Sequence, residues 1–152
     1  MPSRKAAVGP TQSFSFVCHR VRIRIEANDA AALARARAQL PHGFKLISAP
    51  RVDRRFELSV AAKRGKRRLQ TLYADGSRVT SGDAGRVLQR LESAVRLTIA
   101  ELAPHQLFIH AGVVAWKGKA IVIPGRSFAG KSTLVAEFVR EGAIYYSDEY
   151  AV

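Results

Sequence analysis

The sequence predicts an α/β protein in two parts: a small α+β domain, then a partial P-loop nucleotide-binding sheet. Three observations support this prediction. Alternating strand-like runs and an amphipathic helix pattern fill residues 12–104. From residue 105 to residue 152 the strands become apolar throughout. Within this second part the glycine-rich run GRSFAGKS joins an apolar strand to a helix-forming stretch. Residues 1–11 are expected to be disordered.

Composition excludes several classes of protein. Hydrophobic residues make up 47% of the 152 residues, which is enough for a globular core. No apolar run approaches the roughly 18 residues of a membrane span, and no apolar block of a signal peptide follows the start. The single cysteine, Cys18, lies among apolar neighbours and is expected to be a packed thiol. We therefore expect a soluble, cytoplasmic protein without a membrane partner.

Positive charge is concentrated near the N-terminus. The net charge is +13, and residues 1–70 hold 16 basic against 4 acidic side chains. Such asymmetry is one mark of nucleic-acid binding. However, the basic residues are scattered over several elements, and only Lys63–Arg68 form a cluster, which we expect to be a solvated hairpin turn. We therefore do not expect nucleic acid to be the partner.

The first elements of the N-terminal domain follow from periodicity. Residues 21–25 alternate apolar and charged side chains, as a half-buried strand does. Asn28 and Asp29 offer N-caps for a helix over residues 30–40, which is rich in Ala, Leu and Arg. Pro41 ends that helix.

The rest of the domain pairs two strands with a long helix. Residues 55–61 alternate again, and residues 69–74 are the expected partner strand, followed by a turn at 75–76. Ser81 or Asp83 is placed to cap the helix that follows. Apolar residues recur along this helix at steps of three and four, which predicts one buried stripe of Leu88, Leu91, Val95, Ile99 and Leu102.

The C-terminal part is predicted to contain three strands and one helix. The strands are expected at residues 107–116, 120–123 and 143–147, and the helix at 131–140. A P-loop sheet needs more than three strands to bury its apolar faces. We therefore expect an incomplete nucleotide-binding domain: a fragment, a truncated reading frame or one half of a split protein.

The run Gly125–Ser132 matches the pattern G-x-x-x-x-G-K-[ST] in full. Its glycines let the backbone fold around phosphate oxygens, and the N–H groups at the helix start favour negative charge. Lys131 is expected near the β- and γ-phosphates, and Ser132 on Mg²⁺. The side chains of Arg126 and Phe128 fill variable positions. The cofactors expected are ATP and Mg²⁺, bound by Gly125, Arg126, Ser127, Phe128, Ala129, Gly130, Lys131, Ser132 and Thr133.

Three further side chains are candidates for chemistry. Asp148 and Glu149 stand at the carboxyl end of a predicted strand, where a P-loop protein holds Mg²⁺ or activates a nucleophile. Asp148 is therefore a candidate metal ligand, although an Asp-Glu pair is also common in solvated loops. His110 lies mid-strand among apolar residues, a position that is more often taken by a core histidine than by a catalytic one. The other histidines, His19, His42 and His105, are expected to be structural or surface residues.

Residues 107–152 resemble the nucleotide-binding half of the HPr kinase/phosphorylase family. Three features at the right spacings carry the resemblance. Ile109-His110 stands with its histidine 15 residues before Gly125, a short helix ends at Gly142, and the pair Asp148-Glu149 lies on the next strand. The resemblance covers about 46 of the 152 residues.

The resemblance implies an ATP-dependent protein-serine kinase with a sheet like that of phosphoenolpyruvate carboxykinases. It implies that His110 and Lys131 belong to the active site, and that Glu149, beside Asp148, takes the proton from the substrate hydroxyl. The family has Asp-Asp where this chain has Asp-Glu, and it commonly has an acidic residue where Thr133 stands. The first 100 residues do not look like the family's regulatory domain, which points to a relative with another substrate.

Three functional hypotheses follow. The first is a kinase that transfers a phosphoryl group from Mg-ATP to a protein serine or a small hydroxyl substrate. The second is a non-catalytic, nucleotide-binding regulatory fragment. The third is an RNA- or DNA-binding module that uses the basic half. The sequence is compatible with an oligomer in each case.

Overall fold

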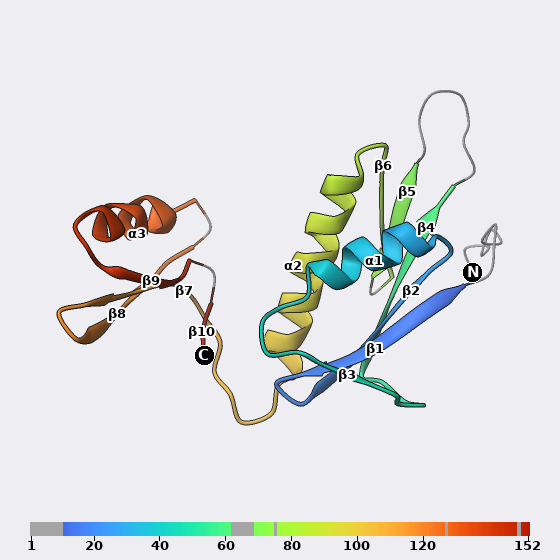
Figure 1. The fold of residues 1–152 in the computed structure, drawn as a ribbon, viewed down its shortest axis with the longest axis horizontal. Helices are drawn as coiled ribbons and strands as arrows, with labels where there is room; N and C mark the ends of the chain where they lie inside the picture. Colours follow the sequence, from blue (N-terminus) through green and yellow to red (C-terminus); the bar gives the residue numbers. More distant parts are fainter. Residues whose placement is uncertain (1–10, 62–68, 75, 127, 149) are drawn as a thin grey trace. The chain divides into compact units, whose positions relative to one another are not determined.

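Figure 1 shows the chain as a computed structural model, which describes residues 11–61, 69–74, 76–126, 128–148 and 150–152. The chain divides into two compact units between Pro104 and His105. We call them the N-terminal unit and the C-terminal unit. The predicted turn at Lys63–Arg68 and all of the predicted disordered N-terminus except Thr11 lie outside the described residues.

The N-terminal unit is built on a six-stranded mixed sheet in the order β3-β1-β2-β4-β5-β6. All neighbours in this order are antiparallel except β2 and β4, which are parallel. Helix α1 (Ala30–Ala38) lies in the connection between these two parallel strands. The strands are β1 (Gln12–Cys18), β2 (Val21–Ala27), β3 (Lys45–Ile47), β4 (Arg54–Val60), β5 (Gln70–Ala74) and β6 (Ser77–Ser81).

Two helices cover one face of this sheet, as Figure 1 shows. Both α1 and α2 (Ala84–Leu102) pack on β2, and they also contact each other. The period-two pattern of β2 explains the core, because its apolar residues are buried while Arg22 between them is exposed. The buried core side chains include Phe16, Val21, Ile23, Ile25, Phe56, Leu58, Val87, Leu91, Val95 and Ile99.

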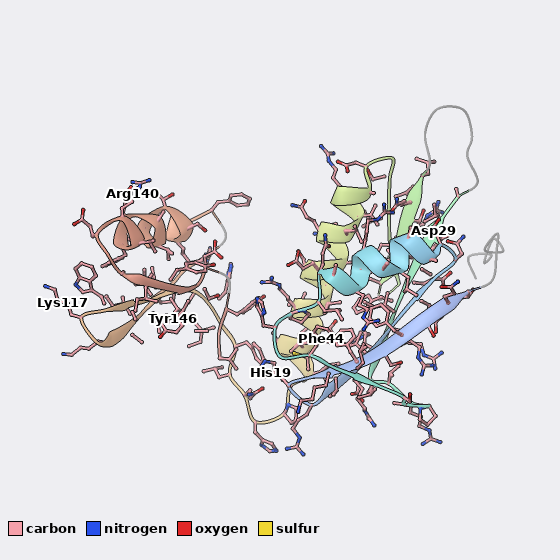
Figure 2. The ribbon with its side chains drawn as sticks, viewed as in Figure 1. His19, Asp29, Phe44, Lys117, Arg140 and Tyr146 are labelled. Carbon is pink, nitrogen blue, oxygen red and sulfur yellow. The ribbon has the colours of Figure 1, made fainter. Side chains whose placement is uncertain are left out.

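Carboxylate caps begin both helices of the N-terminal unit. The Asp29 side chain accepts a hydrogen bond of 2.8 Å from the Ala32 N–H, and Figure 2 shows Asp29 at the start of α1. Asp83 accepts one of 2.8 Å from the Gly85 N–H at the start of α2. These bonds satisfy donors that a helix start otherwise leaves unpaired.

Several details of the N-terminal unit differ from expectation. Strands β1, β3 and β6 had not been predicted individually. Leu102 is 41% exposed, so the prediction that it belongs to the buried stripe is wrong. It lies in the last turn of α2, which is followed by the exposed Pro104. Cys18 is buried as expected, and this burial raises the pKa of its thiol.

The C-terminal unit has a smaller sheet with β7 (Ile109–Trp116) at its centre. Strand β8 (Lys119–Pro124) pairs with β7 on one side through a tight turn at which Figure 2 labels Lys117. Strands β9 (Ile144–Ser147) and β10 (Tyr150–Ala151) pair with successive parts of β7 on its other side. All three are antiparallel to β7. The two-residue strand β10 had not been predicted.

Helix α3 (Lys131–Arg140) packs on β7 and β9. The buried cluster beneath it is small, with Val114, Val135 and Ala143 at its centre and Trp116, Ile121, Ile123 and Phe138 partly buried around them. The predicted strand at residues 120–123 is covered on one face only. Ile121 and Ile123 pack on the cluster, whereas Val122 between them is 44% exposed.

The structure is thus a mixed α/β fold. Among the described residues, no helix is long and apolar enough to cross a membrane.

Candidate phosphate-binding site

The strand directions of the C-terminal unit bring three candidate regions to one edge of its sheet. Strands β8 and β9 both run antiparallel to β7, so they run parallel to each other on its two sides. Their carboxyl ends therefore share an edge with the amino end of β7. The glycine loop (residues 125–130) follows β8, Asp148 follows β9, and His110 stands near the start of β7.

The backbone of the glycine loop makes a sharp reversal before α3. Phe128 and Gly130 both have left-handed backbone angles, with φ of 65° and 81°. A non-glycine residue in this region is uncommon, and such residues cluster at functional sites. Gly130 is the N-cap of α3 and offers no side chain to the first N–H groups of the helix. The start of α3 is thus left able to bind an anion.

Lys131 is the buried cation of the glycine loop. The residue is only 7% exposed, and its Nζ donates to the Gly125 carbonyl at 2.8 Å and to the Arg126 carbonyl at 2.7 Å. An ammonium group has three donors, so these two bonds hold the charge inside the loop and leave capacity for one more acceptor. A Cβ at Gly125 would lie 3.3 Å from Cγ of Lys131, so the missing side chain makes room for the lysine stem.

His110 lies directly beside the glycine loop. Its carbonyl accepts a hydrogen bond of 3.3 Å from the Gly125 N–H, just beyond the last ladder pair of β7 and β8. Its ring centroid is 5.6 Å from that of Tyr150, its partner across the sheet on β10.

Helix α3 approaches β7 closely at Gly112. A Cβ at Gly112 would lie 2.5 Å from Cγ2 of Val135 and 3.9 Å from the Lys131 carbonyl oxygen. The first turn of α3 therefore passes over Gly112. His110 lies two residues earlier on the same face of β7, which places it beyond the start of the helix.

Asp148 lies on the opposite side of β7 from the glycine loop. Its Oδ1 accepts a hydrogen bond of 2.9 Å from the Tyr145 hydroxyl. The pairing of β7 with β9 shifts by one residue between Val113 and Val114, so that Tyr146 is an extra, bulged residue. After the bulge the register continues unchanged into β10, which aligns Tyr150 with His110.

In the structure the glycine loop thus contacts both Lys131, through two of its carbonyls, and the backbone of His110, through the Gly125 N–H; Asp148 follows β9 at the same sheet edge. Ser132 and Thr133 are exposed in the first turn of α3, and Arg126, Phe128 and Ala129 are exposed in the loop. Ser127 and Glu149 lie outside the described residues. The remaining histidines, His19, His42 and His105, are exposed, as expected for surface residues.

The metal prediction depends on oxygen donors. Ser132 and Asp148 supply a hydroxyl and a carboxylate, which suit Mg²⁺. Within the part of the chain that the structure describes, no group of three or more His, Cys, Asp or Glu side chains could hold a metal by itself. This donor set fits an ion that takes most of its ligands from water and a bound phosphate, as Mg²⁺ commonly does.

Sequence reasoning missed two tyrosines of this edge. Tyr145 binds the Asp148 carboxylate, and Tyr150 packs on His110. The available signal was the run Tyr145-Tyr146-Ser147-Asp148, in which a phenol stands three residues before the acid. Only the strand pairing, which sequence does not reveal, links Tyr150 to His110.

In comparisons with protein-family models, curated proteins and solved structures, nothing matched this chain.

Proposed function

We propose that the C-terminal unit binds Mg-ATP and transfers its γ-phosphoryl group to a serine or another hydroxyl, as in the HPr kinase-like family that its sequence resembles. The observation that carries the proposal is the position of the Lys131 ammonium. This ammonium is held inside the glycine loop, at a helix start without a side-chain cap, and the Gly125 N–H of the same loop donates to the carbonyl of His110.

The phosphate tail of the nucleotide fits the chemistry of the glycine loop. The exposed N–H groups at the start of α3 would face the phosphate oxygens, where the helix dipole favours negative charge. Lys131 would add a full positive charge, and the exposed Ser132 hydroxyl would reach the ion. Bound Mg-ATP supplies the phosphoryl group and the cation that neutralises its charge.

The two carboxylates that follow β9 in the sequence, Asp148 and Glu149, support a role in proton removal. Asp148 or Glu149 would take the proton of the acceptor hydroxyl as its oxygen attacks the γ-phosphorus. The hydrogen bond from Tyr145 orients the Asp148 carboxylate, and Tyr150 packs against the ring of His110. These contacts would hold both side chains near the transferred group.

Nucleotide binding is tested with Lys131→Met, which keeps most of the side chain but removes its charge. We expect ATP affinity in a calorimetric titration to fall by about a hundredfold or more, because a charge-assisted phosphate contact is lost. Lys119→Met is the matched control, since Lys119 is an exposed lysine at the start of β8. Unchanged fluorescence of Trp116 would show that the unit is still folded. Undiminished ATP affinity in folded Lys131→Met would contradict the proposal.

Catalysis is tested separately with Glu149→Gln, at the residue that the resemblance assigns as the general base. Loss of a general base slows a reaction by about 10²–10⁴-fold, so this variant should bind ATP normally but transfer phosphate far more slowly. The measurement is ADP release and phosphoserine formation on hydroxyl-bearing acceptors. ATP binding without any turnover in the unmodified chain would instead support the second hypothesis, a nucleotide-binding regulatory protein.

A further inference from the structure

A groove of about 470 Å³ lies on the N-terminal unit, between α2 and the β5–β6 hairpin. Its volume is within the range of ligand-binding clefts, about 300–1,000 Å³. One face of α2 forms the first wall. The side chains of this wall recur at helical spacing: Arg90, Ser93, Ala94, Leu97, Thr98 and Glu101.

The length of the groove matches an extended peptide. From Arg90 to Glu101 the helix rises by about 16 Å, at 1.5 Å per residue. A strand rises about 3.3 Å per residue, so five extended residues cover the same distance. Strand β6, which forms part of the opposite wall through Ser77 and Val79, is itself five residues long.

Strand β6 is also the last strand of its sheet. Among the described residues it pairs with β5 alone, and Ser77, Arg78 and Thr80 are exposed. An edge strand presents a row of backbone N–H and C=O groups along its outer side. A peptide laid along this edge could therefore add a seventh strand, with its side chains alternating toward the groove.

The chemistry of the lining selects an acidic peptide. Val79 and Leu97 give the groove its accessible apolar surface, with Leu97 51% exposed, whereas the third apolar lining residue, Leu72, is buried. Arg90 gives the groove an exposed cation, and Glu101 carries the one carboxylate among its described lining residues. Glu101 is also eleven residues along the helix from Arg90, too far to neutralise it. The whole unit favours an anionic partner, since residues 1–104 hold 20 basic and 8 acidic side chains.

We propose that this groove binds an extended, acidic peptide segment, which pairs with the edge of β6 and places an Asp or Glu side chain against Arg90. Alternate apolar side chains of the peptide cover Val79 and Leu97. The N-terminal unit is thus a docking domain for a protein or peptide partner. This proposal does not depend on nucleotide binding by the C-terminal unit.

The test uses the full chain and fluorescein-labelled seven-residue peptides of alternating valine and threonine. The central residue of each peptide is a valine position, so that it lies on the same face as the other valines, and it is replaced by Asp, Asn or Lys in three versions. We expect the Asp peptide to bind at least about tenfold more tightly than the Asn and Lys peptides in fluorescence anisotropy, since charge complementarity selects partners. Arg90→Ala should remove this preference. Arg37→Ala, at an exposed arginine of α1 outside the groove, should leave it intact.

Peptide N-methylation separates strand addition from simple charge attraction. An added strand uses every second backbone N–H, so methylating one alternate set of amides should abolish binding and methylating the other should leave it nearly unchanged. Amide resonances that shift on binding should belong to β6 and α2.

Three results would overturn the proposal. One is equal affinity for the Asp and Lys peptides, and another is tolerance of both methylation patterns. The third is binding of a small anion such as phenyl phosphate without binding of any peptide, which would make the groove a small-molecule site instead.

Discussion

The two units of this chain are held together in different ways. The N-terminal unit buries a long series of large apolar side chains, among them Phe16, Phe56 and Ile25, each with no exposed surface. The C-terminal unit has three buried residues at the centre of its core. It exposes Phe128 completely and Tyr146 by 66%. The stability of the first unit thus depends on the volume of its buried side chains, whereas the stability of the second depends on backbone geometry and on its glycines.

This difference shows where each unit is sensitive to change. Removing volume should damage the N-terminal unit, and adding volume should damage the C-terminal unit. The only tryptophan of the chain, Trp116, packs on Phe138 in the C-terminal unit, so its fluorescence reports on that unit alone. Circular dichroism reports on both units, which makes the comparison measurable.

The largest expected effect is that of Phe56→Ala in the N-terminal unit. Truncating a fully buried phenylalanine costs about 3–5 kcal/mol of unfolding free energy, because the cavity does not refill. Urea unfolding followed by circular dichroism should show the loss, while the Trp116 transition stays in place. The control is Leu102→Ala, which removes an exposed side chain and should cost less than about 0.5 kcal/mol. Equal costs for the two changes would refute the volume argument.

The next effect is that of Gly112→Ala in the C-terminal unit. The added methyl group would lie 2.5 Å from Cγ2 of Val135, a stiff and buried side chain, so about 1–3 kcal/mol of stability should be lost. The Trp116 transition measures it. Val135→Ala removes the clashing atom, so the double variant should lose less than the two single losses added together. Simple additivity would mean that α3 does not approach β7 as closely as described.

A smaller effect is expected from Asp83→Ala. Its carboxylate accepts the Gly85 N–H at 2.8 Å, and loss of an N-cap costs about 0.5–2 kcal/mol. Asp83→Asn should retain most of the stability, because asparagine caps almost as well. The start of α3 has no such side-chain cap. Side-chain capping therefore stabilises helix starts in the N-terminal unit but not in the C-terminal unit. Equal losses in the Ala and Asn variants would exclude the capping explanation.

The smallest effect concerns pH. Hydrogen bonds from the Arg22 side chain, then from its backbone, hold the pKa of Asp53 below its usual value. A lowered folded-state pKa adds stability that is present above the ordinary Asp pKa of about 3.9 and is lost as pH falls through the folded value. The Arg22 side chain is 49% exposed and the Asp53 side chain 32%, so solvent screening keeps the effect modest.

Thermal unfolding of the chain and of Asp53→Asn between pH 6 and pH 3 measures this contribution. The unmodified chain should be the more stable at pH 6, and the difference should shrink toward pH 3. A difference that stays constant with pH would show that the charge of Asp53 is not involved.

The sequence predicted β2, β4 and α2 well because one face of each is buried, although β1 was not predicted and also has a buried face, with Phe16. The alternation of β2 and β4 and the stripe of α2 all reflect a covered side, and these elements lie within a residue or two of their expected positions. Strand β6 has one apolar residue, Val79, because it lies at the sheet edge, so no alternation marks it. Leu102 was misplaced because periodicity does not reveal where a helix leaves its sheet.

The candidate site was only partly predictable for the same reason. The glycine loop is contiguous in sequence, so a local pattern reveals it. The proximity of His110 to Gly125 depends on how β7 and β8 pair, and the link from Tyr145 to Asp148 depends on the bulge at Tyr146. A residue count cannot supply the contact of His110 with Gly125, because it arises from strand register. The pair Tyr145 and Asp148 is local in sequence, but its contact also needs the bulge between them.

The burial of Cys18 has a practical consequence. It is the only thiol of the chain, it is 3% exposed, and its raised pKa keeps it protonated and unreactive near neutral pH. The folded protein therefore has a surface without a reactive sulfur. A cysteine introduced at an exposed position, such as Lys117 in one unit or Arg37 in the other, would be the one site that a maleimide dye labels. A dye can therefore be attached at a chosen position without first removing a native cysteine.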